Sequence, residues 1–395
     1  MTKENKDYFY RFGYKYFGPL LEDFCYWLLE DLCKNNIQKV YFLSRDGYII
    51  KQVFDIINKN SDIKSYYFYA SRRSITVPSF CDYNNVYEIF SRLTLPDKIK
   101  LESLIKRMGL EEYNLDFFLK KYDLKKSQEY SLEAMKNDNN FNNFFLEIFP
   151  YIKENSIVEK NNIMEYSKKN DFFGKVAIVD IGWNGTMQIS LENLFEKNKI
   201  FGYYMGLNPN GAYKKEKYSN RYKGFICDHK HNQRDYKKIS NFISIFEFLF
   251  LAQHGSVKRF INNNIEFYDY EYENSVENEI VKQIQKGAIN YIENIGSKRD
   301  YNYNSIKKNL NKIFKVFLYP SLTTAKKFGR IKFLDDELGY IANPNSITYY
   351  IYNIKELKKD YINSGWRIGF MKSLFKIVLP YFHINSLLRK FFNKE

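Results

Sequence analysis

VAIVDIGWNGTM, residues 176–187, is the stretch that decides how this chain folds. Its first four residues are apolar and predict a buried strand that ends at Asp180, and apolar residues then recur at helical spacing from Met187 to Phe195. The loop between them contains Gly182, Asn184, Gly185 and Thr186. Because such a loop exposes backbone N–H groups where a helix begins, the unit predicts a phosphate site. An acid at the strand end suits sugar hydroxyls or Mg²⁺, and an ordinary strand-to-helix turn is the alternative.

A second stretch near the N-terminus repeats this design. Residues 39–43 (KVYFL) predict a strand, and residues 49–57 predict an amphipathic helix. The turn between them is Ser44, Arg45, Asp46 and Gly47. Arg45 can bind a phosphate, and Asp46 can bind a hydroxyl or a metal ion. Since parallel strands place such loops at one edge of a sheet, both are expected where open α/β sheets bind their ligands.

These two units predict an α/β fold with a mostly parallel, Rossmann-like sheet. Residues 85–170 show several short helical patterns and no strong strand pattern, so we expect an all-helical insertion over the ligand edge. The expected division is 1–84, first part of the α/β core; 85–170, helical insertion; 171–262, second part of the core; 263–363, helical and irregular C-terminal region; and 364–395, basic amphipathic tail.

Charged residues at two other places are candidates for the same site. Arg72 and Arg73 follow a strand predicted at 66–70 and suit an anion, although a solvated turn would contain the same residues. Glu247 interrupts the apolar helix 242–251, where a carboxylate is costly unless it is paired or functional. A structural arginine is the alternative partner for this acid. His254 and Ser256 follow shortly after, and a lone histidine is more often a core or surface residue.

The composition limits the compartment and the partners. The 395 residues are 45% hydrophobic, contain no run of eighteen apolar residues and begin without an apolar signal segment, so we expect a cytoplasmic protein. Four cysteines without a CxxC pair and only four histidines argue against disulfides and a zinc site. The net charge of +15 predicts an anionic partner. Nucleic acid is not expected, because neither a dense Arg/Lys stripe nor a known module is present.

The C-terminal tail combines apolar and basic residues. Residues 366–392 alternate Ile, Leu and Phe with Arg and Lys, and Pro380 divides them into two predicted helices. This composition is typical of interfacial helices attracted to anionic lipids. We therefore expect peripheral attachment to the inner face of the plasma membrane. A helix docked on the protein's own core is the alternative.

Together the two loops resemble the type I phosphoribosyltransferases. That family has a pyrophosphate loop built from a strand, an arginine, a glycine and a helix. It also has a later strand that ends in an acid, before the loop for the 5-phosphate of phosphoribosyl diphosphate. The matching stretches are residues 41–47 and 176–187. The chain departs from the family in having Ile181 where a second acid usually follows the first.

More of the chain, roughly residues 10–260, is similar to bacterial surface-polysaccharide proteins that are often labelled haloacid-dehalogenase-like hydrolases. The matching stretches are GPLL at 18–21, FLSRDGY at 42–48, YASRRS at 69–74, VDIGWNGTMQ at 179–188, and Glu247 with HGSV at 254–257. The resemblance implies a ribofuranosyltransferase of capsule or O-antigen synthesis. Such an enzyme transfers the 5-phosphoribosyl group from phosphoribosyl diphosphate to a lipid-linked glycan hydroxyl and releases diphosphate.

This reaction gives each candidate residue an expected role. Asp180 would hold the ribose hydroxyls or Mg²⁺, and Asp46 is the second expected metal ligand. Arg45 would neutralise the leaving diphosphate, and either Asp46 or Glu247 would be the base for the acceptor hydroxyl. The remaining substrate-binding residues are Ser44, Gly47, Arg72, Arg73, Gly182, Asn184, Gly185, Thr186, His254 and Ser256.

Two other classes of protein stay open. A dehalogenase-type phosphatase would use a carboxylate nucleophile, but the expected Asp-x-Asp pattern is absent at Asp180-Ile181-Gly182 and at Ser44–Gly47. A non-catalytic component of a polysaccharide-assembly complex would instead bury Arg45 and Asp180 in mutual salt bridges, with no cleft between the two loops.

Overall fold

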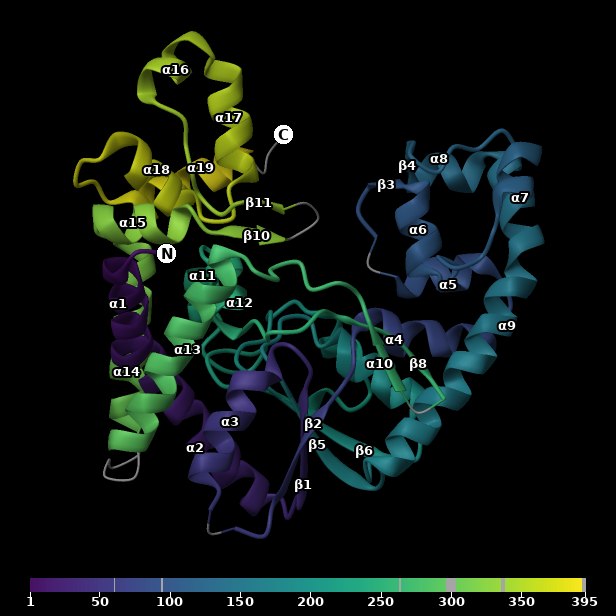
Figure 1. Ribbon diagram of the computed structural model, residues 1–395, viewed down its shortest axis with the longest axis horizontal. Coiled ribbons are helices and arrows are strands. Elements are labelled where there is room, and N and C mark those ends of the chain that lie inside the picture. The colour runs from purple at the N-terminus through teal and green to yellow at the C-terminus, as the bar shows by residue number, and fades with distance from the viewer. Residues whose placement is uncertain (60, 94, 263, 296–302, 335–337, 393–395) are drawn as a thin grey trace.

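Five parallel strands form the central sheet of the computed structural model, which describes all residues except 60, 94, 263, 296–302, 335–337 and 393–395 (Figure 1). They are β1 (Lys39–Leu43), β2 (Lys64–Phe68), β5 (Lys175–Asp180), β6 (Lys199–Tyr204) and β7 (Tyr222–Gly224). The strand order is β2-β1-β5-β6-β7, and each neighbouring pair is parallel. This confirms the predicted α/β class with a parallel sheet and makes the two decisive strands, β1 and β5, direct neighbours.

Different helices cover the two faces of the sheet, because side chains along a strand alternate between faces. On one face Phe42 and Val179 pack with α2 (Gly18–Lys34) and α3 (Gly47–Ile57). On the other face Tyr41 and Ile178 pack with α9 (Asn139–Lys169) and α10 (Thr186–Leu194). Both strands are therefore buried on both sides, which explains why their sequences are continuous apolar runs.

The segment between β2 and β5 starts and ends beside the sheet, and its middle part has its own apolar core at the upper right of Figure 1. Its elements are α4 (Arg72–Thr76), α5 (Val86–Arg92), β3 (Lys98–Lys100), α6 (Leu101–Arg107), α7 (Asp116–Lys121), β4 (Glu129–Ser131), α8 (Leu132–Asn137) and α9. The prediction of an all-helical insertion was wrong in one respect, since β3 and β4 pair as an antiparallel ribbon. Each has only three residues, which is too short for a recognisable strand pattern.

The chain after β7 contributes to both sides of the sheet. Its elements are α11 (Gln233–Ile239), α12 (Ile243–Phe250), β8 (Val257–Ile261), β9 (Asn264–Phe267), α13 (Val276–Ile295), α14 (Tyr303–Leu318), α15 (Leu322–Gly329), β10 (Lys332–Leu334), β11 (Leu338–Tyr340), α16 (Ile347–Tyr352), α17 (Ile354–Asn363), α18 (Arg367–Phe375) and α19 (Tyr381–Phe392). In this part of the chain, α13 packs against α1 (Lys3–Phe12). The region 263–363, expected to be helical and irregular, also contains the antiparallel ribbon β10–β11 and the strand β9, which pairs with β8 just before it.

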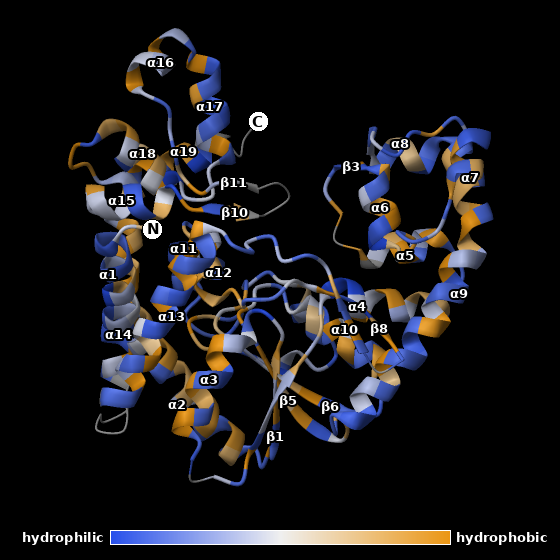
Figure 2. Cartoon of the chain, viewed as in Figure 1, coloured by the Kyte–Doolittle hydropathy of each residue, from blue (hydrophilic) through white to orange (hydrophobic). Residues whose placement is uncertain are grey.

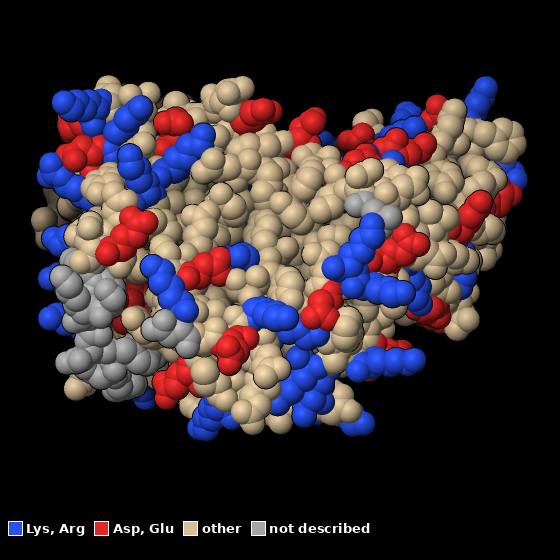
Figure 3. All heavy atoms as spheres, turned by 60° about the horizontal axis from the view of Figure 1, so that its bottom comes forward, with Lys and Arg blue, Asp and Glu red and all other residues tan. Residues whose placement is uncertain are grey.

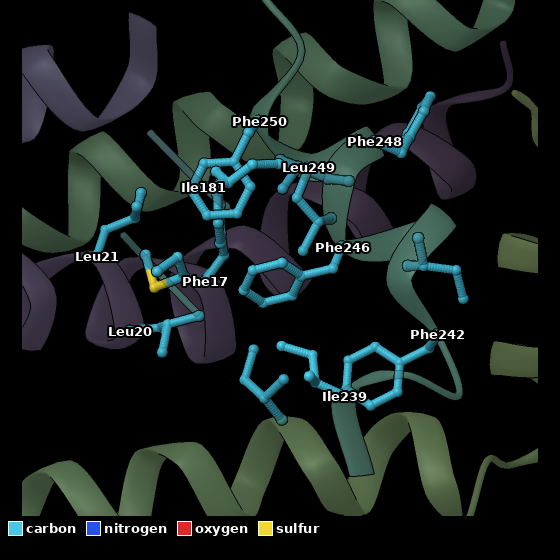
Figure 4. Packing of buried hydrophobic residues seen from close by; sticks show 14 of the residues in the cluster. Phe17, Leu20, Leu21, Ile181, Ile239, Phe242, Phe246, Phe248, Leu249 and Phe250 are labelled. Atoms are coloured by element: carbon cyan, nitrogen blue, oxygen red, sulfur yellow. The ribbon is translucent and has the colours of Figure 1, made fainter. Parts of the chain in front are cut away.

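Helix α12 lies in the middle of the main core. Figure 4 shows its apolar side chains packed between the start of α2 and the loop after β5; the labelled residues are Phe246, Phe250, Phe17, Leu20 and Ile181. The rings of Phe17 and Phe250 meet edge to face, with centroids 5.0 Å apart. This packing fixes the position of Glu247, the charged residue of the helix, beside the loop after β5.

The tail forms two helices, α18 and α19, on either side of Pro380, as predicted. Helix α18 buries Ile368, Phe370, Met371 and Leu374 in the core, so this half of the tail is a packed helix and not an exposed interfacial one. In the hydropathy view of Figure 2 the C-terminal elements stack above α13 and α14. Within the described ranges, no helix has both the length and the apolarity needed to cross a bilayer. Residues 335–337 and 393–395 of the predicted C-terminal segments lie outside the described residues.

Candidate functional site

The strand order reverses between β1 and β5, and the loops that follow these two strands lie side by side at the carboxyl edge of the sheet. This is the place where open α/β sheets bind ligands. A cavity of about 490 Å³ opens there. Its lining includes the predicted residues Ser44, Arg45, Asp46, Arg72, Arg73, Asp180, Gly182, Asn184, Gly185, Thr186, Glu247 and Ser256. Segments far apart in the sequence thus meet at one site.

Local contacts shape the loop after β1. Arg45 has a left-handed backbone with φ +70°, and its N–H donates to the Tyr67 hydroxyl at 2.9 Å. The Ser44 hydroxyl donates to the carbonyl of Ala70 at 2.6 Å and ties this loop to the end of β2. Gly47 does not line the cavity. A Cβ there would lie 2.8 Å from the carbonyl carbon of Phe42, so glycine lets α3 start directly against β1.

The loop after β5 depends on two glycines with positive φ. Gly182 has φ +131°, and a Cβ there would lie 2.0 Å from the carbonyl oxygen of Gly206. Gly185 has φ +70° and directly precedes α10, whose first turn has no side-chain cap. The loop is closed from outside, since the N–H of Asn208 donates to the carbonyl of Trp183 at 2.7 Å. The helix start can therefore offer its N–H groups to an anion.

Two carboxyl groups meet where the loops converge. Asp180 is buried, with 8% of its surface exposed, and its Oδ1 accepts the N–H of Ile181 at 2.9 Å. Asp46 lies beside Asp180, close enough for the two carboxyl groups to interact directly. Burial raises the pKa of both carboxyls, and the charge of Asp180 raises the pKa of Asp46 further. Arg72 opposes both shifts without cancelling them.

The three arginines of the cavity have different surroundings. Nη1 of Arg45 lies 3.6 Å from Oε1 of Glu271. Arg72 is exposed, lines the cavity and has no ion-pair partner within 4.0 Å among the residues that the structure describes. Arg73 lines the cavity as well, but it donates to Glu111 at 3.1 Å and to Glu159 at 2.5 Å. The guanidinium of Arg73 thus holds the insertion, because these two acids compete with any ligand for it. The other two arginines remain available for an anion.

Glu247 and Ser256 also line the cavity. Oε1 of Glu247 accepts the indole N–H of Trp183 at 3.1 Å, so this acid contacts the glycine-containing loop. Ser256 lines the same cavity, next to Leu251 and Phe333.

His254 lies behind the site and does not line the cavity. Its Nε2 is 2.7 Å from the Tyr67 hydroxyl, and its Nδ1 is 2.9 Å from the carbonyl oxygen of Gly255. Because that hydroxyl accepts the Arg45 N–H, its own proton points to Nε2, and Nδ1 carries the ring proton. Burial lowers the pKa of His254, which keeps the ring neutral. The histidine therefore supports the loop after β1. The sequence predicted that it binds the substrate directly, but it does not line the cavity.

Asp46 and Asp180 are suitable ligands for the predicted Mg²⁺. This ion usually binds through one or two carboxylates together with substrate phosphates and waters, and Asp46 and Asp180 provide the carboxylates. The cavity also has the Arg45 and Arg72 charges for the phosphates that would complete such a site. Among the described residues, no group of three or more His, Cys, Asp or Glu side chains could hold a metal by itself. The site thus suits a cation that arrives with a phosphorylated ligand.

Some residues of the site gave no signal in the sequence. Glu271, which pairs with Arg45, and Phe333 of β10 lie in polar segments without a motif. Tyr67 is one of 36 tyrosines, and only its contact with the loop after β1 distinguishes it. Ser71 could have been found, because it precedes the arginine pair and caps the short helix α4.

Compared with known proteins, the chain matches no protein-family model and no curated protein. The fold and the geometry of the cavity therefore carry the functional argument. They describe an α/β protein with a parallel sheet and a charged cavity at the point where the strand order reverses.

Proposed function

We propose that the protein is a glycosyltransferase with a phosphoribosyltransferase-type sheet. In this proposal it transfers 5-phosphoribosyl from phosphoribosyl diphosphate to a hydroxyl of a lipid-linked glycan, in the synthesis of a surface polysaccharide. The observation that carries the proposal is the meeting of the loops after β1 and β5 around one cavity, with acids, arginines and an uncapped helix start.

The donor has three groups that the cavity can match. The 5-phosphate suits the N–H groups at the start of α10, next to Gly185 and Thr186. The ribose hydroxyls suit Asp180, and the diphosphate suits Arg45 and Arg72. When bound, Mg²⁺ would supply positive charge to the leaving diphosphate, and Asp180 would hold it, which leaves Asp46 free for a second role.

The transfer needs a base for the acceptor hydroxyl. We propose Asp46, because its raised pKa makes its carboxylate a stronger base than an exposed aspartate. The acceptor oxygen would form a bond to the anomeric carbon, the bond from that carbon to the diphosphate oxygen would break, and diphosphate would leave with the electron pair. The acceptor proton would pass to Asp46. Glu247, which holds Trp183, is then a positioning residue for the glycine-containing loop.

The other classes receive less support from this geometry. A dehalogenase-type phosphatase needs two acids on one strand end, whereas Asp46 and Asp180 follow different strands. A non-catalytic role predicted a salt bridge between Arg45 and Asp180 and no cleft. The ion pair that Arg45 makes is with Glu271, and a cavity separates the loops.

The first test is calorimetric titration with phosphoribosyl diphosphate and Mg²⁺. We expect micromolar binding by the wild type, and a loss of about 10- to 100-fold in Asp180→Asn, since a hydrogen bond to a charged group contributes about 1.5–3 kcal/mol. Asp116→Asn, at an exposed carboxylate on α7, is the matched control and should bind like the wild type. Absence of binding by folded wild-type protein would overturn the proposal, and nucleotide sugars would be the next donors to titrate.

A further inference from the structure

A contiguous run of apolar side chains is exposed between the last two helices. Ile377, Val378 and Leu379 connect α18 to Pro380, and Val378 has 92% of its surface exposed. Phe375, the last residue of α18, is exposed as well. Single exposed apolar residues are normal on a protein surface, but a contiguous group of them marks an interaction site.

Hydrogen bonds hold this connector in a fixed shape. The ammonium of Lys372 and the hydroxyl of Tyr381 both donate to the carbonyl oxygen of Ile377, each at 3.0 Å. Lys376 has a left-handed backbone with φ +62° and ends α18, with its N–H donating to the carbonyl of Lys372 at 3.1 Å. Because the backbone is tied to both helices, its apolar side chains project from a braced loop.

The charge of this part of the chain is of one sign. Residues 361–394 contain no Asp or Glu, and their basic residues are Arg367, Lys372, Lys376, Arg389, Lys390 and Lys394. Other surfaces are mixed, as on the face of Figure 3, where Lys and Arg alternate with Asp and Glu. Apolar residues at the tip could lie among acyl chains, and the basic residues that flank them along the chain could contact negative headgroups.

We propose that residues 375–379 insert into the interface of a membrane that contains anionic lipids, with Val378 entering deepest. Apart from its last residue, Phe375, helix α18 cannot make this contact, because its other apolar residues are buried in the core. The connector between α18 and Pro380 therefore enters the membrane, and Lys376 contacts the headgroups. The inference does not depend on the chemistry proposed for the cavity.

The test is co-sedimentation of the full chain with vesicles of phosphatidylcholine that contain about one third phosphatidylglycerol. We expect the wild type to bind these vesicles, to bind pure phosphatidylcholine more weakly, and to be released by about 1 M salt, where the Debye length is about 3 Å. In Val378→Asp the partition coefficient should fall about tenfold or more, since a charge replaces the two methyl groups that the membrane would bury. The variant exchanges an exposed side chain and should stay folded.

Val158→Asp is the matched control. Val158 lies on α9, on the other side of the molecule, and 55% of its surface is exposed, so the same substitution there should leave vesicle binding unchanged. The proposal is overturned if the wild type does not bind anionic vesicles, or if Val378→Asp binds them like the wild type. Equal losses in both variants would also overturn it. Light scattering adds one more contrary outcome: a dimer that Val378→Asp dissociates, without vesicle binding, would make a second copy of the chain the occupant.

Discussion

Arg72 and Arg73 are neighbours in sequence, yet they belong to two charge clusters with opposite properties. Arg73 lies in a buried network in which Glu111, Glu159 and the carbonyl of Lys258 accept from its guanidinium. Arg72 faces the cavity, where burial raises the pKa of both Asp46 and Asp180. The first cluster satisfies its charges inside the protein, and the second leaves charge available for a ligand.

The difference shows how the partners of a charged side chain distinguish a structural role from a binding role. A satisfied network joins parts of a fold, and Arg73 joins the insertion to the strand β8. A cluster of like charges destabilises the native state on its own and persists where a ligand compensates it. We therefore expect removal of Arg73 to lower stability, removal of Arg72 to change it little, and removal of an acid of the cavity to raise it.

The largest expected effect is on stability when Arg73 is removed. Arg73→Ala should lower the free energy of unfolding by about 3–5 kcal/mol, because it leaves the buried Glu159 and the half-buried Glu111 without their cation. Arg72→Ala should change it by no more than about 0.5 kcal/mol, since this side chain is exposed. Chemical denaturation of both variants measures the difference. Similar losses in the two variants would remove the distinction between the clusters.

The next effect is a pH dependence caused by the acid pair. The pKa values of Asp46 and Asp180 are raised in the folded protein above the ordinary value of about 4, so the native state binds more protons than the unfolded state above that pH. Stability contributed by the protonated pair is therefore lost as the pH rises through the folded-state pKa values. Asp46→Asn removes one ionisable group and should become more stable relative to the wild type, by about 1 kcal/mol or more, between about pH 5 and pH 8.

Unfolding curves at several pH values measure this shift, and Asp116→Asn is the control for a carboxylate outside the cavity. A stability difference between Asp46→Asn and the wild type that does not change with pH would show that the pair does not hold a proton.

Most of the sheet and the two loops could be predicted from sequence, because their signals are local. The strand Lys39–Leu43 was predicted with its observed bounds, and its neighbour β5 was predicted to end at Asp180. Continuous apolar runs indicate strands that are buried on both faces, and glycines with positive φ at Gly182 and Gly185 agree with the expected loop. The parallel pairing of β1 with β5 then brings the loops together.

Contacts between distant segments could not be predicted in the same way. The partners of Arg73 lie 38 and 86 residues away, and the sequence does not distinguish this arginine from Arg72. The composition of the tail predicted an interfacial helix, but it does not reveal that α18 is covered by the core. In both cases tertiary packing determines which of two similar side chains or helices remains available.

The smallest expected effect concerns His254, which the sequence placed among the substrate-binding residues. Its ring accepts from Tyr67, whose hydroxyl holds the Arg45 N–H, so it acts on the cavity only through two neutral hydrogen bonds. His254→Ala should weaken binding of phosphoribosyl diphosphate by about threefold, because a neutral hydrogen bond contributes about 1 kcal/mol or less. Arg72→Ala should weaken it by about tenfold or more, since a charged contact to phosphate is lost. Calorimetry on both variants separates the two roles. A loss in His254→Ala as large as in Arg72→Ala would mean that the histidine contacts the donor, and that the loop after β1 rearranges when the donor binds.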